Sequence, residues 1–500
     1  MGHLADNLVL GFRVALGPLN LLYCLVGAVL GTLIGVLPGI GPVATIAMLL
    51  PATFKLPPVA ALIMLAGIYY GAQYGGSTTA ILVNVPGESS SVVTCLDGYA
   101  MARQGRAGPA LGIAALGSFF AGCVATLILA LFAPPLAELA LRFGPTETFS
   151  LMVLGLVAAA VLAQGSLLKA AAMIFLGLLL GLVGTDVNSG ALRFAFGIPE
   201  LSDGIGFVAL AMGMFGFAEI VANLEVREKR EVFTDAVQAL LPTRADLKAS
   251  WKAVLRGTGV GSLLGVLPGG GAILGSFASY SLEKRLAADP SRFGKGAIEG
   301  VAGPESANNA GAQTSFIPLL TLGIPPNAVM AMMMGAMTIH GITPGPLVIR
   351  QQPELFWGVV ASMWVGNLLL VVLNLPLIGI WVRLLKVPYR LLYPAILLFC
   401  CIGVYSVSNS TFDVVLTAAF GVLGYLFIKL QCEPAPLLLG FILGPLMEEN
   451  LRRALRLSRG DPSVFFTQPL SLAMLLGAAI LLVLIIVPAV RSTRSEAFRG

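Results

Sequence analysis

The sequence predicts an all-α polytopic membrane protein, with about 12 transmembrane helices plus re-entrant or broken half-helices in two inverted repeats. Its 500 residues are 57% hydrophobic and only 11% charged, whereas a soluble domain has about 25% charged residues. Apolar stretches of about 20 residues, the length that crosses a bilayer as a helix, recur along the chain. The phrase GTLIGVLPGIG at 31–41 returns as GSLLGVLPGGG at 261–271, which indicates a duplication.

Breaks at glycine, proline and charge clusters divide the chain into candidate spans. They lie near 18–37, 57–84, 109–133, 147–164, 166–184, 204–224, 252–267, 307–324, 326–349, 355–383, 390–407, 412–430 and 470–490. Three further apolar pieces, 41–54, 272–283 and 435–448, are too short to cross alone, and we expect them to be re-entrant half-helices.

Residues 225–256 form the only long polar interval, and this interval is rich in lysine and arginine. The positive-inside rule places it in the cytoplasm. It divides the chain into membrane repeat 1 (1–224), a cytoplasmic basic linker (225–251) and membrane repeat 2 (252–450). A C-terminal part (451–500) adds a polar Arg-rich stretch, a final transmembrane helix and a cytoplasmic tail, and the side of the Arg-rich stretch stays open.

The two halves match beyond the opening phrase. The sequence GAQ at 71–73 returns at 311–313, and Pro86 corresponds to Pro325, at offsets of 240 and 239 residues. Landmarks in the same order at a nearly constant offset favour an internal duplication over chance. Equivalent loops of the two halves have opposite charge bias, which predicts inverted topology.

The repeated phrases predict broken helices near the bilayer midplane. Proline removes a backbone donor, glycine permits close backbone approach, and paired interruptions in two halves point to the central site of a transporter. The alternative is a glycine-rich surface for helix packing with an ordinary proline kink. We expect a substrate site made by Pro38, Gly39, Gly41, Ser77, Thr78, Asn84, Pro86, Gly87, Pro268, Gly269, Gly271, Ser306, Asn308, Asn309 and Thr314.

These residues offer hydroxyls, amides and glycine backbone, which donate hydrogen bonds to an anion without holding it irreversibly, and a half-helix N-terminus adds partial positive charge. Glu88 and Glu305, with Thr79 and Ser315, are candidates for coupling a cation. Either glutamate can instead cap a helix. Because so few groups titrate, we expect Na⁺ coupling rather than H⁺ coupling. Asp97, Asp186 and Glu219 are weaker candidates.

The chain resembles the large membrane (permease) subunit of the tripartite tricarboxylate transporter family. The resemblance rests on the twin phrases, on YYGAQYGGSTTAILVNVPGE at 69–88 and on GPESANNAGAQTSFIPLLTLGIP at 303–325. It implies a multi-pass permease of the bacterial inner (cytoplasmic) membrane that imports tricarboxylates or dicarboxylates such as citrate by symport with a cation. It also implies a periplasmic solute-binding protein and a small membrane subunit as partners.

Other function classes fit the composition less well. With His3 and His340 as its only histidines and six scattered cysteines, the chain shows no metal-ligand spacing and no cluster typical of a membrane-embedded enzyme. We expect no cofactor beyond a coupling ion. The net charge of +5 belongs to loops between lipid-facing spans, not to a nucleic-acid surface. A channel, or a carrier for another small organic anion that needs no binding protein, stays open as an alternative.

Overall fold

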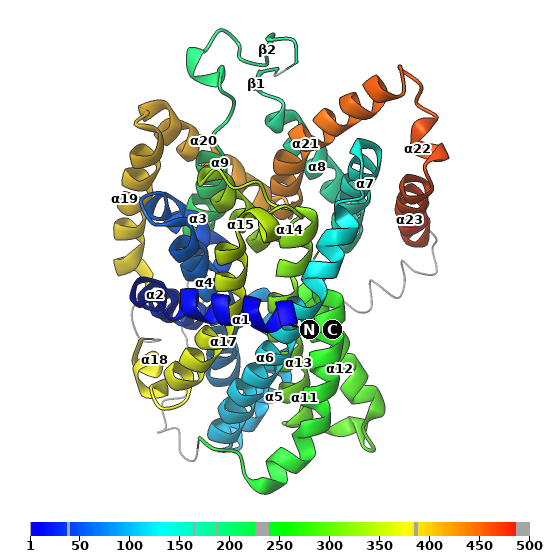
Figure 1. The fold of residues 1–500 in the computed structure, drawn as a ribbon. Helices are drawn as coiled ribbons and strands as arrows, with labels where there is room; N and C mark the ends of the chain where they lie inside the picture. Colours follow the sequence, from blue (N-terminus) through cyan, green and yellow to red (C-terminus); the bar gives the residue numbers. More distant parts are fainter. Residues whose placement is uncertain are drawn as a thin grey trace.

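The computed structural model describes residues 2–37, 41–163, 166–186, 188–225, 240–269, 271–384 and 389–486. In these residues the protein is built almost entirely of helices, with one two-stranded antiparallel hairpin. Figure 1 shows α5, α6, α11, α12 and α13 in the lower part of the molecule and α7, α8, α20 and α21 in the upper part. The all-helical prediction is confirmed.

The first half contains the following elements. They are α1 (Gly2–Ala15), α2 (Pro18–Val36), α3 (Pro42–Thr53), α4 (Pro58–Val83), the short helix η1 (Ser89–Ser91), α5 (Val92–Arg103), α6 (Ala107–Ala140), α7 (Pro145–Leu162), α8 (Leu167–Gly181), β1 (Gly184–Thr185), β2 (Leu192–Arg193), η2 (Pro199–Leu201), α9 (Phe207–Ala211), the π-helical turn η3 (Met212–Phe217) and α10 (Ala218–Glu225).

The second half follows the interval 226–239, which lies outside the described residues. Its elements are α11 (Arg244–Gly265), α12 (Gly271–Leu286), η4 (Pro290–Arg292), α13 (Glu299–Thr314), α14 (Phe316–Leu322), α15 (Ala328–Ile339), α16 (Val348–Gln351), α17 (Pro353–Asn374), α18 (Ile378–Leu384), α19 (Tyr389–Ser408), α20 (Thr411–Lys429), α21 (Ala435–Leu457), α22 (Val464–Thr467) and α23 (Pro469–Ile486).

Within the described residues, six helices are long and apolar enough to cross a membrane by length and composition. They are α2, α6, α7, the continuous segment Phe207–Glu225, α17 and α20, and four shorter apolar helices accompany them. The chain is therefore a polytopic membrane protein, and the expected total of about 12 crossings stays a prediction.

Glycines hold the repeated phrase against a neighbouring helix in both halves. A β-carbon on Gly35 of α2 would lie 2.4 Å from the Ala72 carbonyl oxygen of α4. A β-carbon on Gly31 of α2 would lie 2.6 Å from the Ile68 carbonyl oxygen of α4. In the second half, a β-carbon on Gly261 of α11 would lie 2.1 Å from the Ala307 carbonyl oxygen of α13. The backbones are thus in direct contact, as small residues permit between membrane helices.

The two helix pairs run in opposite directions. Residue numbers rise together along α2 and α4, and along α11 and α13, so each pair is parallel. Between the pairs the order reverses: Tyr69 and Ser315 share Asn327 as a hydrogen-bond partner, whereas Ser77, further along α4, contacts Glu305, earlier on α13. Hence α4 and α13 are antiparallel, and so are α2 and α11.

Two helices are longer than the expected spans. α11 begins at Arg244, before the expected span 252–267 and within the expected linker 225–251, because Thr243 and Asp246 form a capping box at its N-terminus. The division into two repeats and a cytoplasmic linker stays a prediction. α21 is one helix of 23 residues, not a half-helix over 435–448. The ion pairs Glu448–Arg452 and Glu449–Arg453, each four residues apart, continue it through the start of the Arg-rich stretch.

The hairpin β1–β2 between α8 and α9 projects from the helices at the top of Figure 1. Asp186 in its turn accepts hydrogen bonds from the Asn188 N–H and the Ser189 hydroxyl and pairs with Arg452 of α21 at 3.1 Å. These donors, the Asn188 N–H first, hold the pKa of Asp186 down at about 2. Arg193 joins the hairpin to Glu448 at 2.9 Å, so polar contacts fix this hairpin on α21.

Candidate functional site

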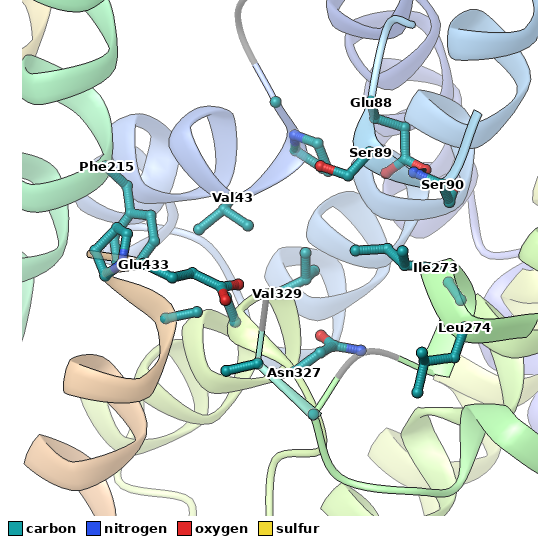
Figure 2. A pocket seen from close by; sticks show the side chains of 18 of the residues that line it. Val43, Glu88, Ser89, Ser90, Phe215, Ile273, Leu274, Asn327, Val329 and Glu433 are labelled. Atoms are coloured by element: carbon teal, nitrogen blue, oxygen red, sulfur yellow. Dashed lines mark hydrogen bonds between the residues drawn. The ribbon is translucent and has the colours of Figure 1, made fainter. Parts of the chain in front are cut away.

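A cavity of about 460 Å³ lies where elements of the two halves meet. Figure 2 shows the side chains of Glu88, Asn327 and Glu433 approaching it from different segments. Its wall is made by Gly41, Pro42, Val43, Tyr69, Gln73, Pro86, Gly87, Glu88, Ser89, Ser90, Val92, Ala159, Leu162, Ala163, Phe215, Glu219, Gly269, Ala272, Ile273, Leu274, Asn327, Ala328, Val329, Glu433, Pro434, Ala435, Pro436 and Leu439. We call it the central cavity.

Four helices of twelve or more residues begin at the wall of the central cavity. They are α3, capped by Gly41, α12, which starts at Gly271, α15, capped by Asn327, and α21, which starts at Ala435. The first N–H groups of a helix have no partner within the helix, and the helix dipole adds roughly half a positive charge there. The cavity wall therefore presents main-chain donors suited to an anion.

Glu88 and Asn327 occupy equivalent places in the two halves, at the same offset of 239 residues that relates Pro86 to Pro325. Glu88 caps η1 by accepting from the Ser90 N–H at 3.2 Å, and Asn327 caps α15 by accepting from the Met330 N–H at 3.0 Å. Each follows a proline-containing break between two helices, since Pro86 precedes Glu88 and Pro325 precedes Asn327. The duplicated break thus delivers one capping side chain from each half to the same cavity.

Gln73 anchors Glu88 to α4. Its amide donates to the Glu88 carboxylate at 3.0 Å, and its amide oxygen accepts from the Ser90 hydroxyl at 2.7 Å. Ser276 of α12 donates in turn to the Ser90 carbonyl oxygen at 2.7 Å. This network ties the Glu88 side of the cavity to α4 and to α12 of the other half.

Three carboxylates line the central cavity: Glu88, Glu219 and Glu433. Glu219 accepts a hydrogen bond from the Gly41 N–H at 3.3 Å, which holds it at the start of α3. Glu433 precedes the first turn of α21. Among the described residues of the wall there is no lysine, arginine or histidine. Positive potential in this part of the wall comes from helix N-termini alone.

Glu305 lies behind the cavity wall and is fully buried. Its carboxylate accepts from the Ser77 hydroxyl at 2.5 Å, from the Asn308 amide at 3.1 Å and from the Thr94 hydroxyl. We call Glu305, Ser77, Thr94 and Asn308 the Glu305 cluster. It joins α13 of the second half to α4 and α5 of the first.

The same face of α13 carries further buried polar atoms. Asn309 donates to the Ser118 hydroxyl of α6 at 2.7 Å and to the Asn308 amide oxygen at 2.7 Å. The Asn309 amide oxygen, the Ser306 hydroxyl and both polar atoms of Gln313 have no hydrogen-bond partner among the described residues. Buried polar groups are normally hydrogen bonded, so water or a ligand is the expected partner here.

The chain matches the family model described as "Tripartite tricarboxylate transporter TctA family" over residues 21–439. The chain belongs to this family. It is 61% identical over 498 residues, 100% of this chain and 99% of the relative, to an Agrobacterium vitis protein described as an uncharacterized 52.8 kDa protein in the TAR-I ttuC' 3' region. A shorter A. vitis protein, described from the TAR-II ttuC' 3' region, is 62% identical over 238 residues, 48% of this chain and 98% of the relative. No solved structure matches.

The TctA fold divides the site residues expected from the sequence into two groups that lie close together. Gly41, Pro86, Gly87 and Gly269, with Glu88, line the central cavity. A second group is buried behind it or close by: Ser77, Glu305, Ser306, Asn308 and Asn309. Of the second group none is part of the cavity wall, so these residues do not touch a ligand in the cavity as the structure stands.

Other expected site residues make contacts that support the fold of this TctA chain. Asn84 is exposed, lies off the cavity wall and ends α4 at a positive φ of 57°, a left-handed conformation that its short polar side chain suits. Thr79, Thr314 and Ser315 donate to carbonyl oxygens of helix backbones.

Of the remaining expected residues, Thr78 is buried and Pro268 half-buried, and both lie off the cavity wall. A β-carbon on Gly271 would meet the Gly265 Cα at 2.6 Å, so close packing requires this glycine. Pro38 and Gly39 lie outside the described residues.

The wall of the central cavity also contains Tyr69, Gln73, Asn327 and Glu433, which were not among the expected site residues, and Glu219, which was only a weaker candidate. The offset of 239 residues from Glu88 was the available signal for Asn327. Glu219 stood inside an apolar span, where a carboxylate is a functional candidate by default. The described residues hold no group of three or more His, Cys, Asp or Glu side chains placed to bind a metal ion.

Proposed function

We propose that this TctA chain is the permease of a cation-coupled secondary transporter that imports tricarboxylates or dicarboxylates, such as citrate, across the bacterial inner membrane. The family supports the class of transporter. The observation that carries the site is the convergence of four helix N-termini on the central cavity. Its volume of about 460 Å³ falls within the usual range for small-molecule sites, roughly 300–1,000 Å³.

The cavity chemistry suits reversible binding of carboxylates. Helix N-termini, Gln73 and Asn327 supply neutral or partial-charge donors. A full ion pair with arginine or lysine would hold a multiply charged anion more firmly, and the described wall has none. A transporter needs a site that also releases its substrate, and neutral donors satisfy that need.

Two glutamates of the cavity wall, Glu88 and Glu219, support a cation in the transport cycle. Unit charges of like sign a few ångströms apart repel strongly in a partly buried site. A carboxylate substrate therefore binds beside Glu88 and Glu219 only when bound cations or protons neutralise part of that charge. Substrate and cation must then occupy the cavity together, which is the thermodynamic basis of symport.

The antiparallel arrangement of α2–α4 and α11–α13 supports inverted repeats. Each pair starts with a broken phrase followed by a helix at the cavity, α3 or α12, and the opposite directions of the pairs match a two-fold axis in the membrane plane. We infer that the two repeats open the cavity alternately to each side of the membrane.

The lower end of the molecule in Figure 1 is proposed to be cytoplasmic. Arg106 pairs with Asp246, and Gln104 donates to the Lys295 carbonyl oxygen, which gathers the basic ends of α5, α11 and α12 on one face. This agrees with the positive-inside rule. α6 begins directly after Arg106 and runs 34 residues to Ala140, about 51 Å along its axis.

Ala140 lines a second cavity of about 930 Å³, which also borders α7, α15 and α21. The same three helices contribute to the wall of the central cavity. We infer that the second cavity is the periplasmic vestibule, where a solute-binding protein delivers substrate. The small membrane subunit is the other partner that the family implies.

Uptake by reconstituted transporter tests the proposal. Proteoliposomes with the chain and its small subunit are supplied with labelled mono-, di- and tricarboxylates, with and without the binding protein, under imposed Na⁺ or proton gradients. We expect accumulation of a di- or tricarboxylate that requires the binding protein and a cation gradient. Accumulation without the binding protein would support a self-sufficient carrier, and uptake that only equilibrates the substrate under every gradient would support a channel.

A further inference from the structure

Two carboxylates are fully buried in the described part of the chain, and their partners differ in kind. Asp97 accepts from the main-chain N–H groups of Gly294, Gly296 and Ala297 and from the Tyr280 hydroxyl. Main-chain N–H groups only donate, so Asp97 is held as an acceptor. Glu305 instead accepts from two hydroxyls and one side-chain amide, and hydroxyls both donate and accept.

The Glu305 cluster can satisfy both protonation states of its carboxyl group. The Ser77 oxygen lies 2.5 Å from Glu305 Oε2 and 3.1 Å from the Gln73 carbonyl oxygen. When Glu305 is ionised, Ser77 donates to it. When Glu305 is protonated on Oε2, the acid donates to the Ser77 oxygen, and the Ser77 hydrogen turns to the Gln73 carbonyl. Neither state leaves a polar atom of the Glu305 cluster unpaired.

In the part of the chain that the structure describes, no positive charge pairs with an ionised Glu305. Glu88 faces it across α4 from the cavity, and Cys95 faces it from α5. On α11 and α12 the nearest charged groups, Arg256 and Glu283, pair with each other. Among the described residues no lysine, arginine or histidine forms an ion pair with Glu305, and a buried, uncompensated charge is costly.

Because of its position, the charge of Glu305 acts on the proposed substrate site. Its partners Ser77 and Thr94 belong to the first repeat, so the cluster crosses the boundary between the proposed repeats. Gln73, one turn before Ser77, holds Glu88 in the cavity. A proton on Glu305 removes a negative charge from behind the wall and rearranges a contact between the repeats.

We propose that Glu305 binds the proton that is carried with the carboxylate, an inference that rests on the proposed transport function. The proton enters from the periplasmic side, forms the O–H bond on Glu305 while substrate occupies the cavity, and leaves to the cytoplasm after substrate release. One proton moves per cycle and no other bond changes. The coupling ion is then H⁺, in place of the Na⁺ expected from the sequence.

The test compares accumulation with exchange in proteoliposomes that hold the complete transporter, in Na⁺-free buffers. A one-unit inward proton gradient sustains up to about tenfold accumulation per proton carried. Wild type should accumulate the labelled carboxylate. Glu305→Gln should lose accumulation and keep exchange of external labelled for internal unlabelled substrate, with a rate that no longer varies with pH.

The matched control is Glu299→Gln, on the same helix, where Glu299 pairs with the exposed Arg292; it should accumulate substrate as wild type does. Proton-driven accumulation by Glu305→Gln would overturn the inference and leave the transport function intact. So would a Glu305→Gln variant that melts like wild type but has lost both exchange and accumulation. A parallel series adds a Na⁺ gradient, and wild-type uptake that ignores the pH gradient and appears only with Na⁺ would also overturn the inference. Wild type that neither accumulates nor exchanges any carboxylate, with or without Na⁺, would remove the proposed function itself.

Discussion

Asn327 is the residue that best separates a binding role from a capping role. It accepts from the Met330 N–H, and its amide nitrogen donates to Tyr69 of the cavity wall and to Ser315. Asn327→Ala should cost about 1 kcal/mol of stability as a lost cap. If it also donates to substrate, carboxylate affinity should fall by roughly ten- to a hundredfold. Thermal melting and binding of labelled substrate measure the two effects separately.

Asn84 supplies the control for Asn327, because it is an exposed residue next to the same kind of break but off the cavity wall. Asn84→Gly keeps the positive φ that this position requires. Substrate affinity should stay at the wild-type value. A similar loss of affinity in both variants would show that Asn327 acts through the fold and not through substrate.

Gly265 tests the packing role of the repeated phrase. A β-carbon there would lie 2.1 Å from the Thr314 hydroxyl and 2.6 Å from the Gly311 Cα. Gly265→Ala should therefore destabilise the protein by about 1–3 kcal/mol, as overpacking does. Gly259→Ala on the same helix meets nothing within 4 Å and should be neutral or slightly stabilising. Thermal unfolding of the two variants in detergent decides; equal melting temperatures would contradict the close α11–α13 contact.

At the scale of single elements, α21 shows how polar contacts extend a helix beyond its apolar part. Arg452 pairs with both Asp186 of the hairpin and Glu448, whereas Arg453 pairs with Glu449 alone. Arg452→Gln should speed hydrogen exchange in residues 184–206, up to about fivefold for a loss near 1 kcal/mol. Arg453→Gln should leave this exchange unchanged. Equal exchange in both variants would mean that Arg452 does not hold the hairpin.

The pH dependence of this contact follows from the low pKa of Asp186, about 2. The ordinary aspartate value is about 4. Because the folded state lowers the pKa, the contribution of Asp186 to stability is present above pH 4 and is lost as the pH falls toward 2. The rate of amide hydrogen exchange in the hairpin of the wild type, corrected for intrinsic rates, should thus be constant between pH 5 and 7.

Element by element, the sequence predicted what depends on composition and repetition. The apolar spans, the broken phrases and the short helices α3 and α12 follow from hydropathy with proline and glycine breaks. The β1–β2 hairpin was missed because ion pairs to α21, which is distant in the sequence, fix it. The end of α21 was missed because its apolar part stops before the ion pairs Glu448–Arg452 and Glu449–Arg453 that continue the helix. At the site, Glu88 and Gly269 could be named from the duplication, whereas Glu433 comes to the cavity only through tertiary packing.

At the scale of the whole molecule, the inverted repeats predict that equivalent loops face opposite sides of the membrane. Lys55 follows α3 and Asp289 follows α12, and both are exposed. In a variant without native cysteines, Lys55→Cys should react with an impermeant thiol reagent only from the periplasm, and Asp289→Cys only from the cytoplasm. Labelling of both from one side would contradict the inverted arrangement.

The central claim is that carboxylates bind where the N-termini of α3, α12, α15 and α21 converge, and substrate protection tests it most directly. Ser89 is exposed on the cavity wall, and Arg103 is exposed at the far end of α5. In the cysteine-free background, a transported carboxylate should slow thiol labelling of Ser89→Cys and leave labelling of Arg103→Cys unchanged. Labelling of Ser89→Cys at the same rate with and without saturating substrate would contradict the central cavity as the carboxylate site.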